Sequence, residues 1–152
     1  MSETITEIIK TCDRHADRLN WAMVQLQPHI PFTEASIKNL NDIDIAILDQ
    51  FSTRFGKLQD LMGAKLFPLV LDITKEPGDL KAFIDKLYRL EKIGAIDSAE
   101  DWLLLREARN NFSHDYPDDQ GLQVALLNKA YDLAKQLLKI LNDIKVFISA
   151  YL

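Results

Sequence analysis

The chain of 152 residues is poor in several features that would assign it to a specific class of protein. It has one cysteine, so no internal disulfide can form, and one thiol with three scattered histidines makes no metal-ligand cluster. We therefore expect no metal, no cofactor and a location in the reducing cytoplasm. Glycine and proline number five each, about 7% of the chain together, against roughly 12% in average proteins. So few turn-forming residues favour long helices over a β-sandwich or barrel.

An excess of basic residues is also missing. Lys and Arg number 18 against 23 Asp and Glu, which gives a net charge of −5. A chain of this sign lacks the global field that attracts polyphosphates, so any nucleic-acid role must come from a local basic cleft. No run of about 18 apolar residues exists, and the N-terminal sequence MSETITEIIK is acidic where a signal peptide would be basic. We expect one domain over residues 1–152 and no membrane association.

Apolar residues recur at intervals of three and four along most of the chain, which predicts amphipathic helices with one buried face. The first helix is expected from Ile5 to about Gln27, and a short piece capped by Thr33 follows to Leu40. A second long helix is expected from Asn41 or Asp42 until Pro68 kinks or ends it.

The C-terminal half continues this pattern. A third helix is expected from the cap Asp79 to the stop at Gly94, and a fourth from Asp97 or Ser98 to about Asp115. A fifth begins at Asp118 or Asp119 and runs to the C-terminus. Long helices with short connections predict an all-α fold, an antiparallel four-helix bundle of the up-down type with an additional short helix. Tyr151 and Leu152 continue the last apolar stripe, which favours packing on a second copy of the chain.

The most informative stretch is REARNNFSHDYP, residues 106–117. Arg109 falls on one line of its helix with Leu105 and Phe112, so this guanidinium stands in an apolar row and needs a partner. Asn110 and His114 are four residues apart, which lets the amide orient the imidazole. Arg109 and His114 point about 140° apart around the axis of an ideal helix. One phosphate can therefore contact both side chains only if it lies between them, or if the last turn of the helix unwinds.

A purely structural interpretation of the same residues stays open. Arg109 can reach a carboxylate, His114 can cap the carbonyl groups at the helix end, and Tyr116 can be a core aromatic residue with a solvated hydroxyl. The combination of Arg-Asn with a His five residues after the Arg and a Tyr two residues later is rare by composition, which favours a functional interpretation.

The pattern Arg109-Asn110, three residues, then His114-Asp115-Tyr116 resembles the signature of the HEPN superfamily. More narrowly, it resembles HepT-like toxins and the substrate-binding partners of minimal nucleotidyltransferases. The resemblance extends to RFGKLQDLMGAKLFP at residues 54–68 and to IDSAEDW before the motif. It implies an all-α homodimer that brings two Arg/His pairs to one cleft. It also implies metal-independent RNA cleavage by Arg109 and His114, and adenylylation of Tyr116 by a cognate nucleotidyltransferase antitoxin.

The residues suit that chemistry. An imidazole titrates near neutrality and can take or give a proton, while a guanidinium keeps its charge and can bind two phosphate oxygens. The acidic sequence DYPDDQ beside the motif opposes RNA binding unless other basic residues help, and Arg54, Lys57 and Arg106 are the nearest candidates by type.

Three functions therefore remain open. The leading hypothesis is a toxin of a toxin-antitoxin module, an endoribonuclease using Arg109 and His114 and neutralised through Tyr116. The alternative is a non-catalytic nucleotide-binding partner subunit of a minimal nucleotidyltransferase. The third is a structural dimer whose motif only stabilises the interface.

Overall fold

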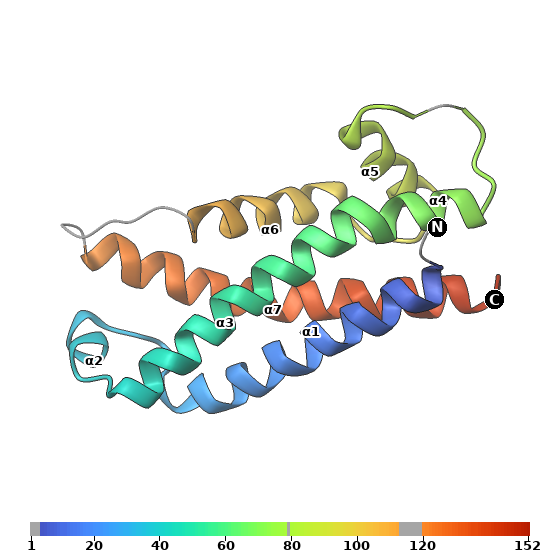
Figure 1. The fold of residues 1–152 in the computed structure, drawn as a ribbon. Coiled ribbons are helices and arrows are strands. Elements are labelled where there is room, and N and C mark those ends of the chain that lie inside the picture. Colours follow the sequence, from blue (N-terminus) through green and yellow to red (C-terminus); the bar gives the residue numbers. More distant parts are fainter. Residues whose placement is uncertain (1–3, 79, 113–119) are drawn as a thin grey trace.

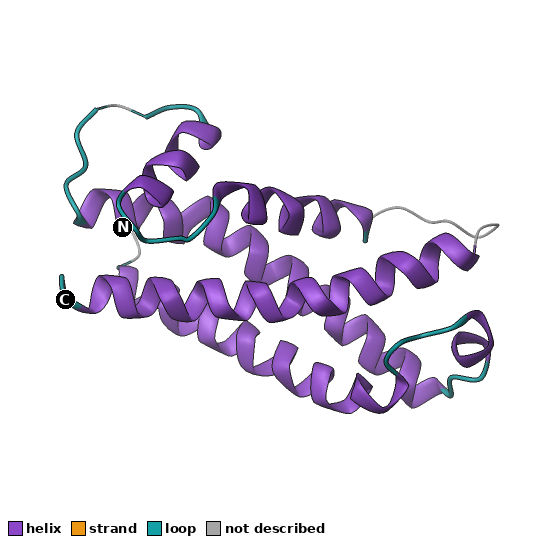
Figure 2. Cartoon of the chain, turned by 180° about the vertical axis from the view of Figure 1, so that it is seen from behind, coloured by secondary structure: helices purple, strands orange, loops and turns teal. Residues whose placement is uncertain are grey.

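The computed structural model describes residues 4–78, 80–112 and 120–152, and every regular element in these ranges is a helix (Figure 2). The prediction of an all-α fold is confirmed. The elements are α1 (Ile5–Leu26), η1 (Gln27–His29), α2 (Glu34–Lys38), α3 (Asp42–Leu61), η2 (Met62–Leu66), α4 (Phe67–Ile73), α5 (Phe83–Lys92), α6 (Ala99–Asn111) and α7 (Gln120–Ser149).

Four long helical segments run in alternating directions along the molecule (Figure 1). These are α1, the continuous segment α3–η2–α4, α6 and α7. Contacts join α1 to α3, α3 to α6, α6 to α7 and α7 to α1, and α3 also contacts α7, so each segment touches at least two others. The short helix α5 contacts α4 and α6 at one end, and α2 contacts α7 at the other. The segment α3–η2 thus lies between α1 and α6.

Side-chain caps fix where most of these helices begin. Thr33 and Asn41 each accept a hydrogen bond from the backbone three residues later, as expected for N-caps. Of the two candidates before α6, Ser98 is the cap, because its hydroxyl accepts from the amide of Asp101. The expected cap Asp97 instead pairs with Lys139 on α7.

The predicted start of the third helix differs from the structure, and the predicted start of the fifth helix lies outside the described residues. The third predicted helix, α5, begins at Phe83, and its N-cap is Ala82, whose methyl side chain cannot accept a capping hydrogen bond. The expected cap Asp79 lies outside the described residues, as do Asp118 and Asp119 before α7. The predicted stop at Gly94 is confirmed by its φ of 85°, which a residue without a Cβ adopts freely.

Pro68 does not end the second long helix. Proline cannot donate to the carbonyl four residues back, and its ring would clash there. The structure accommodates it with a π-helical turn, η2, in which the amide of Phe67 bonds to the carbonyl of Met62, five residues back. The helix therefore passes through the proline and continues to Ile73, and the turn carries Gly63 and Ala64 on its surface facing α5 and α6.

The core is aromatic where α3, α6 and α7 meet. The ring of Phe112 packs edge-on against Phe51 and Phe55, and Tyr131 stacks on Phe51. Trp102 is fully buried against Phe67. This packing fixes the orientation of α6, which carries the motif residues that the structure describes.

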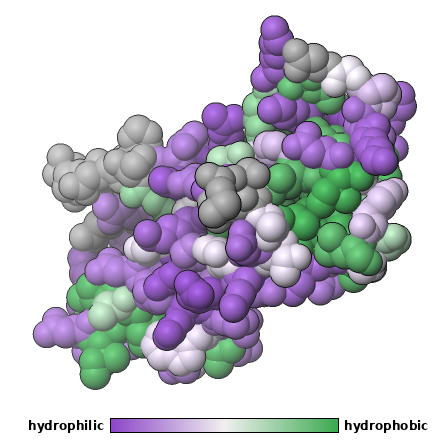
Figure 3. Space-filling model, turned by 45° about the vertical axis from the view of Figure 1, so that its right-hand side comes forward, coloured by the Kyte–Doolittle hydropathy of each residue, from purple (hydrophilic) through white to green (hydrophobic). Residues whose placement is uncertain are grey.

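Some apolar side chains are exposed on the surface of the protein. Figure 3 shows hydrophobic residues gathered toward the right of its view, while hydrophilic residues cover much of the remaining face. Tyr151 and Leu152 are 52% and 68% exposed, so packing on a second chain stays a prediction. No helix among the described residues is both long enough and apolar enough to cross a membrane.

Asn128 on α7 ties down the segment that precedes α2, since its side chain accepts from the amide of Phe32 and donates to the carbonyl of the same residue. We expect Asn128→Ala to lower the free energy of unfolding by about 1–3 kcal/mol, because both backbone groups lose their partner. Thermal denaturation should show a decrease of several degrees. The control Asn142→Ala, on the exposed side of the same helix, should leave the melting temperature nearly unchanged. Equal effects of the two substitutions would contradict this role.

Candidate functional site

The side chain of Arg109 lies across α3 at Gly56, a residue that has no side chain of its own. A Cβ placed on Gly56 would lie 3.0 Å from both Cδ and Nε of Arg109. The two helices therefore approach closely enough that the arginine stem lies on the backbone of α3. Gly56 is buried by this contact.

Asp60, one helical turn after Gly56, is the partner that Arg109 requires. Nε and Nη2 of Arg109 both donate to Oδ2 of Asp60, at 3.3 and 3.1 Å. The side chains are 33% and 55% exposed, so the ion pair lies at the surface. Because both bonds end on one oxygen, the guanidinium does not use the two-oxygen geometry that it can make with a phosphate.

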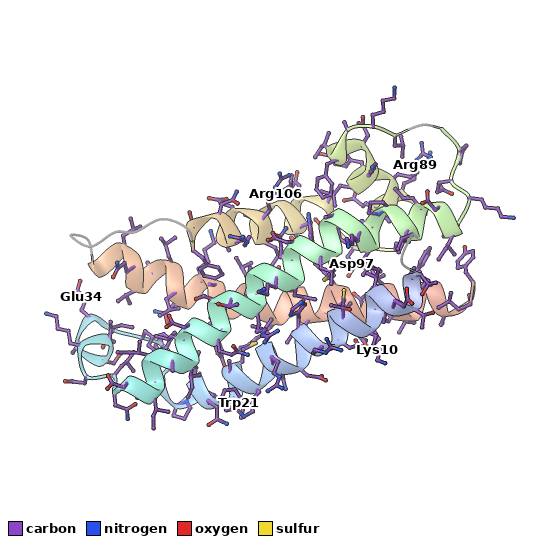
Figure 4. The ribbon with its side chains drawn as sticks, viewed as in Figure 1. Lys10, Trp21, Glu34, Arg89, Asp97 and Arg106 are labelled. Atoms are coloured by element: carbon purple, nitrogen blue, oxygen red, sulfur yellow. The ribbon has the colours of Figure 1, made fainter. Side chains whose placement is uncertain are left out.

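This ion pair borders a cavity of about 500 Å³ between α3–η2, α5 and α6. The small residues of the π-turn form one side, and Phe83 of α5 forms another. The guanidinium carbon of Arg106 lies 5.4 Å from the centre of the Phe83 ring, and Figure 4 marks Arg106 on α6. The cavity is lined by Gln59, Asp60, Gly63, Ala64, Phe83, Arg106, Arg109 and Asn110.

The lining is positively charged although the chain is acidic. Arg106 and Arg109 contribute two positive charges and Asp60 one negative charge, which leaves an excess of one positive charge. A cavity of this sign suits an anion. Among the described residues no group of three His, Cys, Asp or Glu side chains could hold a metal ion. Cys12 is buried, and burial raises the pKa of its thiol to about 12, so this side chain is a packing residue.

Arg54 and Lys57 belong to another part of the surface. Nη1 of Arg54 donates to Nδ1 of His15 on α1 at 3.0 Å, and Nε of Arg54 is buried without a partner. Burial lowers the pKa of His15, and the charges of Arg54, Lys57 and Arg14 lower it further. Of the three basic candidates in the sequence, only Arg106 lines the cavity beside Arg109.

The other predicted site residues are placed in part. Asn110 is exposed and lines the cavity. His114 and Tyr116 lie outside the described residues, so their catalytic and modification roles stay predictions. The fourth helix ends at Asn111, and Phe112 is its C-cap.

The sequence pattern did not predict a place in the site for Gly56, Gln59, Asp60 or Phe83. Gly56 is the one signal that could have been used, because a glycine inside a helix costs about 1 kcal/mol relative to alanine and therefore suggests close packing. The partner of Arg109 could not be found, since 49 residues separate it from Asp60.

The substitution Gly56→Ala should move the side chain of Arg109 without destabilising the fold. The new Cβ would displace a flexible side chain, while alanine favours the helix, so we expect an unchanged or slightly higher melting temperature. We also expect the Nε–H resonance of Arg109 to move toward that of a solvated arginine in nuclear magnetic resonance spectra. An unchanged resonance would show that the two helices do not meet as described.

The lowered pKa of His15 should make the protein less stable in mild acid. Its folded-state pKa lies below the ordinary value of 6.5, so below that pH the unfolded chain binds more protons than the folded chain. The free energy of unfolding should therefore decrease as the pH falls below about 6.5. Glutamine can accept the hydrogen bond from Arg54 without titrating, so His15→Gln should reduce this decrease in denaturant titrations at pH 7.5 and 5.0. Parallel pH dependence in both proteins would exclude the effect.

No family model, no curated protein and no solved structure matches this chain. The resemblance to the HEPN superfamily therefore stays a prediction from the motif. Any function assigned to the chain depends on its own residues and on their geometry.

Proposed function

We propose that this chain is a HEPN-type toxin, a metal-independent endoribonuclease that acts as a homodimer. The observation that carries the proposal is the location of Arg109, whose guanidinium lies over Gly56 at the edge of a positively charged cavity. A fixed, permanently charged group beside an open cavity is suited to bind a phosphate and stabilise the charge that develops on it.

The reaction needs two proton transfers in addition to this charge. The 2′-hydroxyl oxygen attacks the adjacent phosphorus, its proton passes to a base, and the bond from phosphorus to the 5′-oxygen breaks as an acid protonates the leaving oxygen. A 2′,3′-cyclic phosphate and a free 5′-hydroxyl result. Imidazoles suit both steps near neutral pH, and a dimer supplies two copies of His114.

Asp60 supports a phosphate ligand at Arg109. A carboxylate that accepts from Nε and Nη2 occupies the donors that phosphate oxygens would take. An exposed ion pair contributes only about 0–1 kcal/mol, so an incoming phosphate can replace it at little cost. In this proposal Tyr116, seven residues after Arg109, is adenylylated by a nucleotidyltransferase antitoxin, and the added phosphate blocks the site.

A second candidate is the nucleotide-binding partner subunit of a minimal nucleotidyltransferase. The volume of the cavity favours it, because about 500 Å³ lies within the range of small-molecule sites. In this function Arg109 and Asn110 would hold a nucleotide, and His114 would perform no chemistry.

Expression in bacteria separates the two candidates. We expect the parent protein to arrest growth and to produce RNA fragments with 2′,3′-cyclic phosphate ends. Arg109→Ala and His114→Ala should abolish both effects, because the first removes the charge at the phosphate and the second removes the proton donor and acceptor. Arg18→Ala, on the exposed side of α1, is the matched control and should remain toxic.

The oligomeric state and solubility of each variant must be equal for this comparison. Absence of arrest and intact RNA with a soluble, dimeric parent protein would contradict the ribonuclease and favour the nucleotide-binding subunit. If Arg109→Ala lowers the melting temperature by several degrees and the parent is not toxic, the motif serves only the structure.

A further inference from the structure

Arg54 is a charged residue without an acidic partner among the residues that the structure describes. Its side chain is half-buried between α3 and α1, and the one described group that accepts a hydrogen bond from it is the imidazole of His15, at 3.0 Å. Its Nε is buried and has no partner. A guanidinium that is partly removed from water needs an anion to compensate its charge.

The hydrogen bond from Arg54 determines which nitrogen of the neutral His15 ring carries the proton. A guanidinium can only donate, so Nδ1 of His15 is the acceptor. The proton of the neutral ring therefore lies on Nε2, which donates to no described residue. Arg54 and His15 thus present hydrogen-bond donors from two adjacent helices.

Further positive charge lies around this pair. Lys57 follows Arg54 by three residues on α3, Arg14 precedes His15 on α1, and both side chains are exposed. Burial lowers the pKa of His15 most, and the three cations lower it further. We refer to the group of four residues, Arg14, His15, Arg54 and Lys57, as the α1–α3 cluster.

Acidic residues of the same two helices are engaged elsewhere. Asp13 binds Lys145 of α7 at 2.8 Å, and Asp60 binds Arg109. Asp17, two residues after the histidine of the cluster, points to a different side of α1. The chain has 23 acidic and 18 basic residues, yet this part of its surface carries an excess of positive charge. The mutual repulsion of these charges is relieved when an anion is bound among them.

We propose that the α1–α3 cluster is an anion site that takes a phosphate group. The planar guanidinium of Arg54 can bind two oxygens of a tetrahedral anion, and the other three residues of the cluster add donors and charge around it. The cluster lies on the side of α3 that faces α1, whereas Arg109 lies on the side that faces α6. The site therefore goes beyond the proposed function and does not require RNA cleavage.

The test measures the pKa of His15 in the full chain by nuclear magnetic resonance titration, with sulfate as the probe. Sulfate is a tetrahedral dianion whose charge stays constant over the titration, so any pH dependence of its binding comes from the protein. Replacing chloride by sulfate at equal ionic strength should raise the pKa of His15 by at least about half a unit, because a bound negative charge favours the imidazolium. His29, which lies 3.6 Å from Asp44, is the internal control and should titrate identically in both salts.

Two variants and a matched control locate the site. Arg54→Gln should abolish the rise, because it removes the central charge. Lys57→Gln, at an exposed position, should weaken sulfate binding about threefold to fivefold, as expected for the loss of one neighbouring charge in water. Lys92→Gln removes the same charge from an exposed position on α5 and should leave the affinity unchanged. Equal losses in the two lysine variants would show that sulfate responds only to net charge, and they would overturn the proposal.

A second probe identifies the source of the phosphate group. Short single-stranded DNA carries phosphodiester groups and lacks the 2′-hydroxyl that cleavage requires. If the site holds a nucleic-acid strand, this DNA should raise the pKa of His15 as sulfate does, whereas a site for free phosphate should respond to the inorganic anion alone. Either result supports the anion site.

The inference and the proposed function fail separately. If sulfate leaves the pKa of His15 unchanged, the anion site is wrong, even where the parent protein cleaves RNA. If sulfate raises this pKa and the parent cleaves no RNA, the ribonuclease is wrong and the anion site stands.

Discussion

The close approach of α6 to α3 at Gly56 determines the geometry of the candidate site. An arginine in the apolar row of α6 must either be excluded from the interface or cross the facing helix where no side chain blocks it. Gly56 permits the second solution, since Cδ and Nε of Arg109 lie where a Cβ at this position would meet them. The guanidinium then emerges beside Asp60, one turn further along α3. The site therefore depends on a glycine that contributes no functional group.

The small residues of α3 and η2 have a second consequence. Gly63 and Ala64 lie in the π-turn that accommodates Pro68, and they leave space between this segment, α5 and α6. Larger side chains at these two positions would occupy part of that space. The backbone irregularity at Pro68 thus places small residues beside the cavity between α3–η2, α5 and α6. π-turns of this kind are frequent at functional sites because they change the face that a helix presents.

Local rules predicted most of the fold and little of the site. Thr33, Asn41, Ser98 and Gly94 mark helix ends in the structure because capping and left-handed backbone geometry depend on neighbouring residues alone. The passage of the helix through Pro68 could not be predicted, since packing of Phe67 and Leu71 in the core outweighs the local preference. The pairing of Arg109 with Asp60 and of Arg54 with His15 depends on how α6 and α1 pack on α3, which no single helix encodes.

Binding and cleavage use separable parts of the chain in this interpretation. Gln59, Phe83, Arg106 and Arg109 line the cavity from three packed segments, and the core fixes the mutual position of these segments. The proposed acid and base, His114, follows the helix that supplies Arg109. In the proposed function, a chain that kept the cavity and lost this histidine would still bind the phosphate ligand but would not transfer the proton. The two candidate functions therefore propose the same binding surface, and they differ only in whether a proton-transferring group reaches the phosphate that Arg109 is proposed to bind.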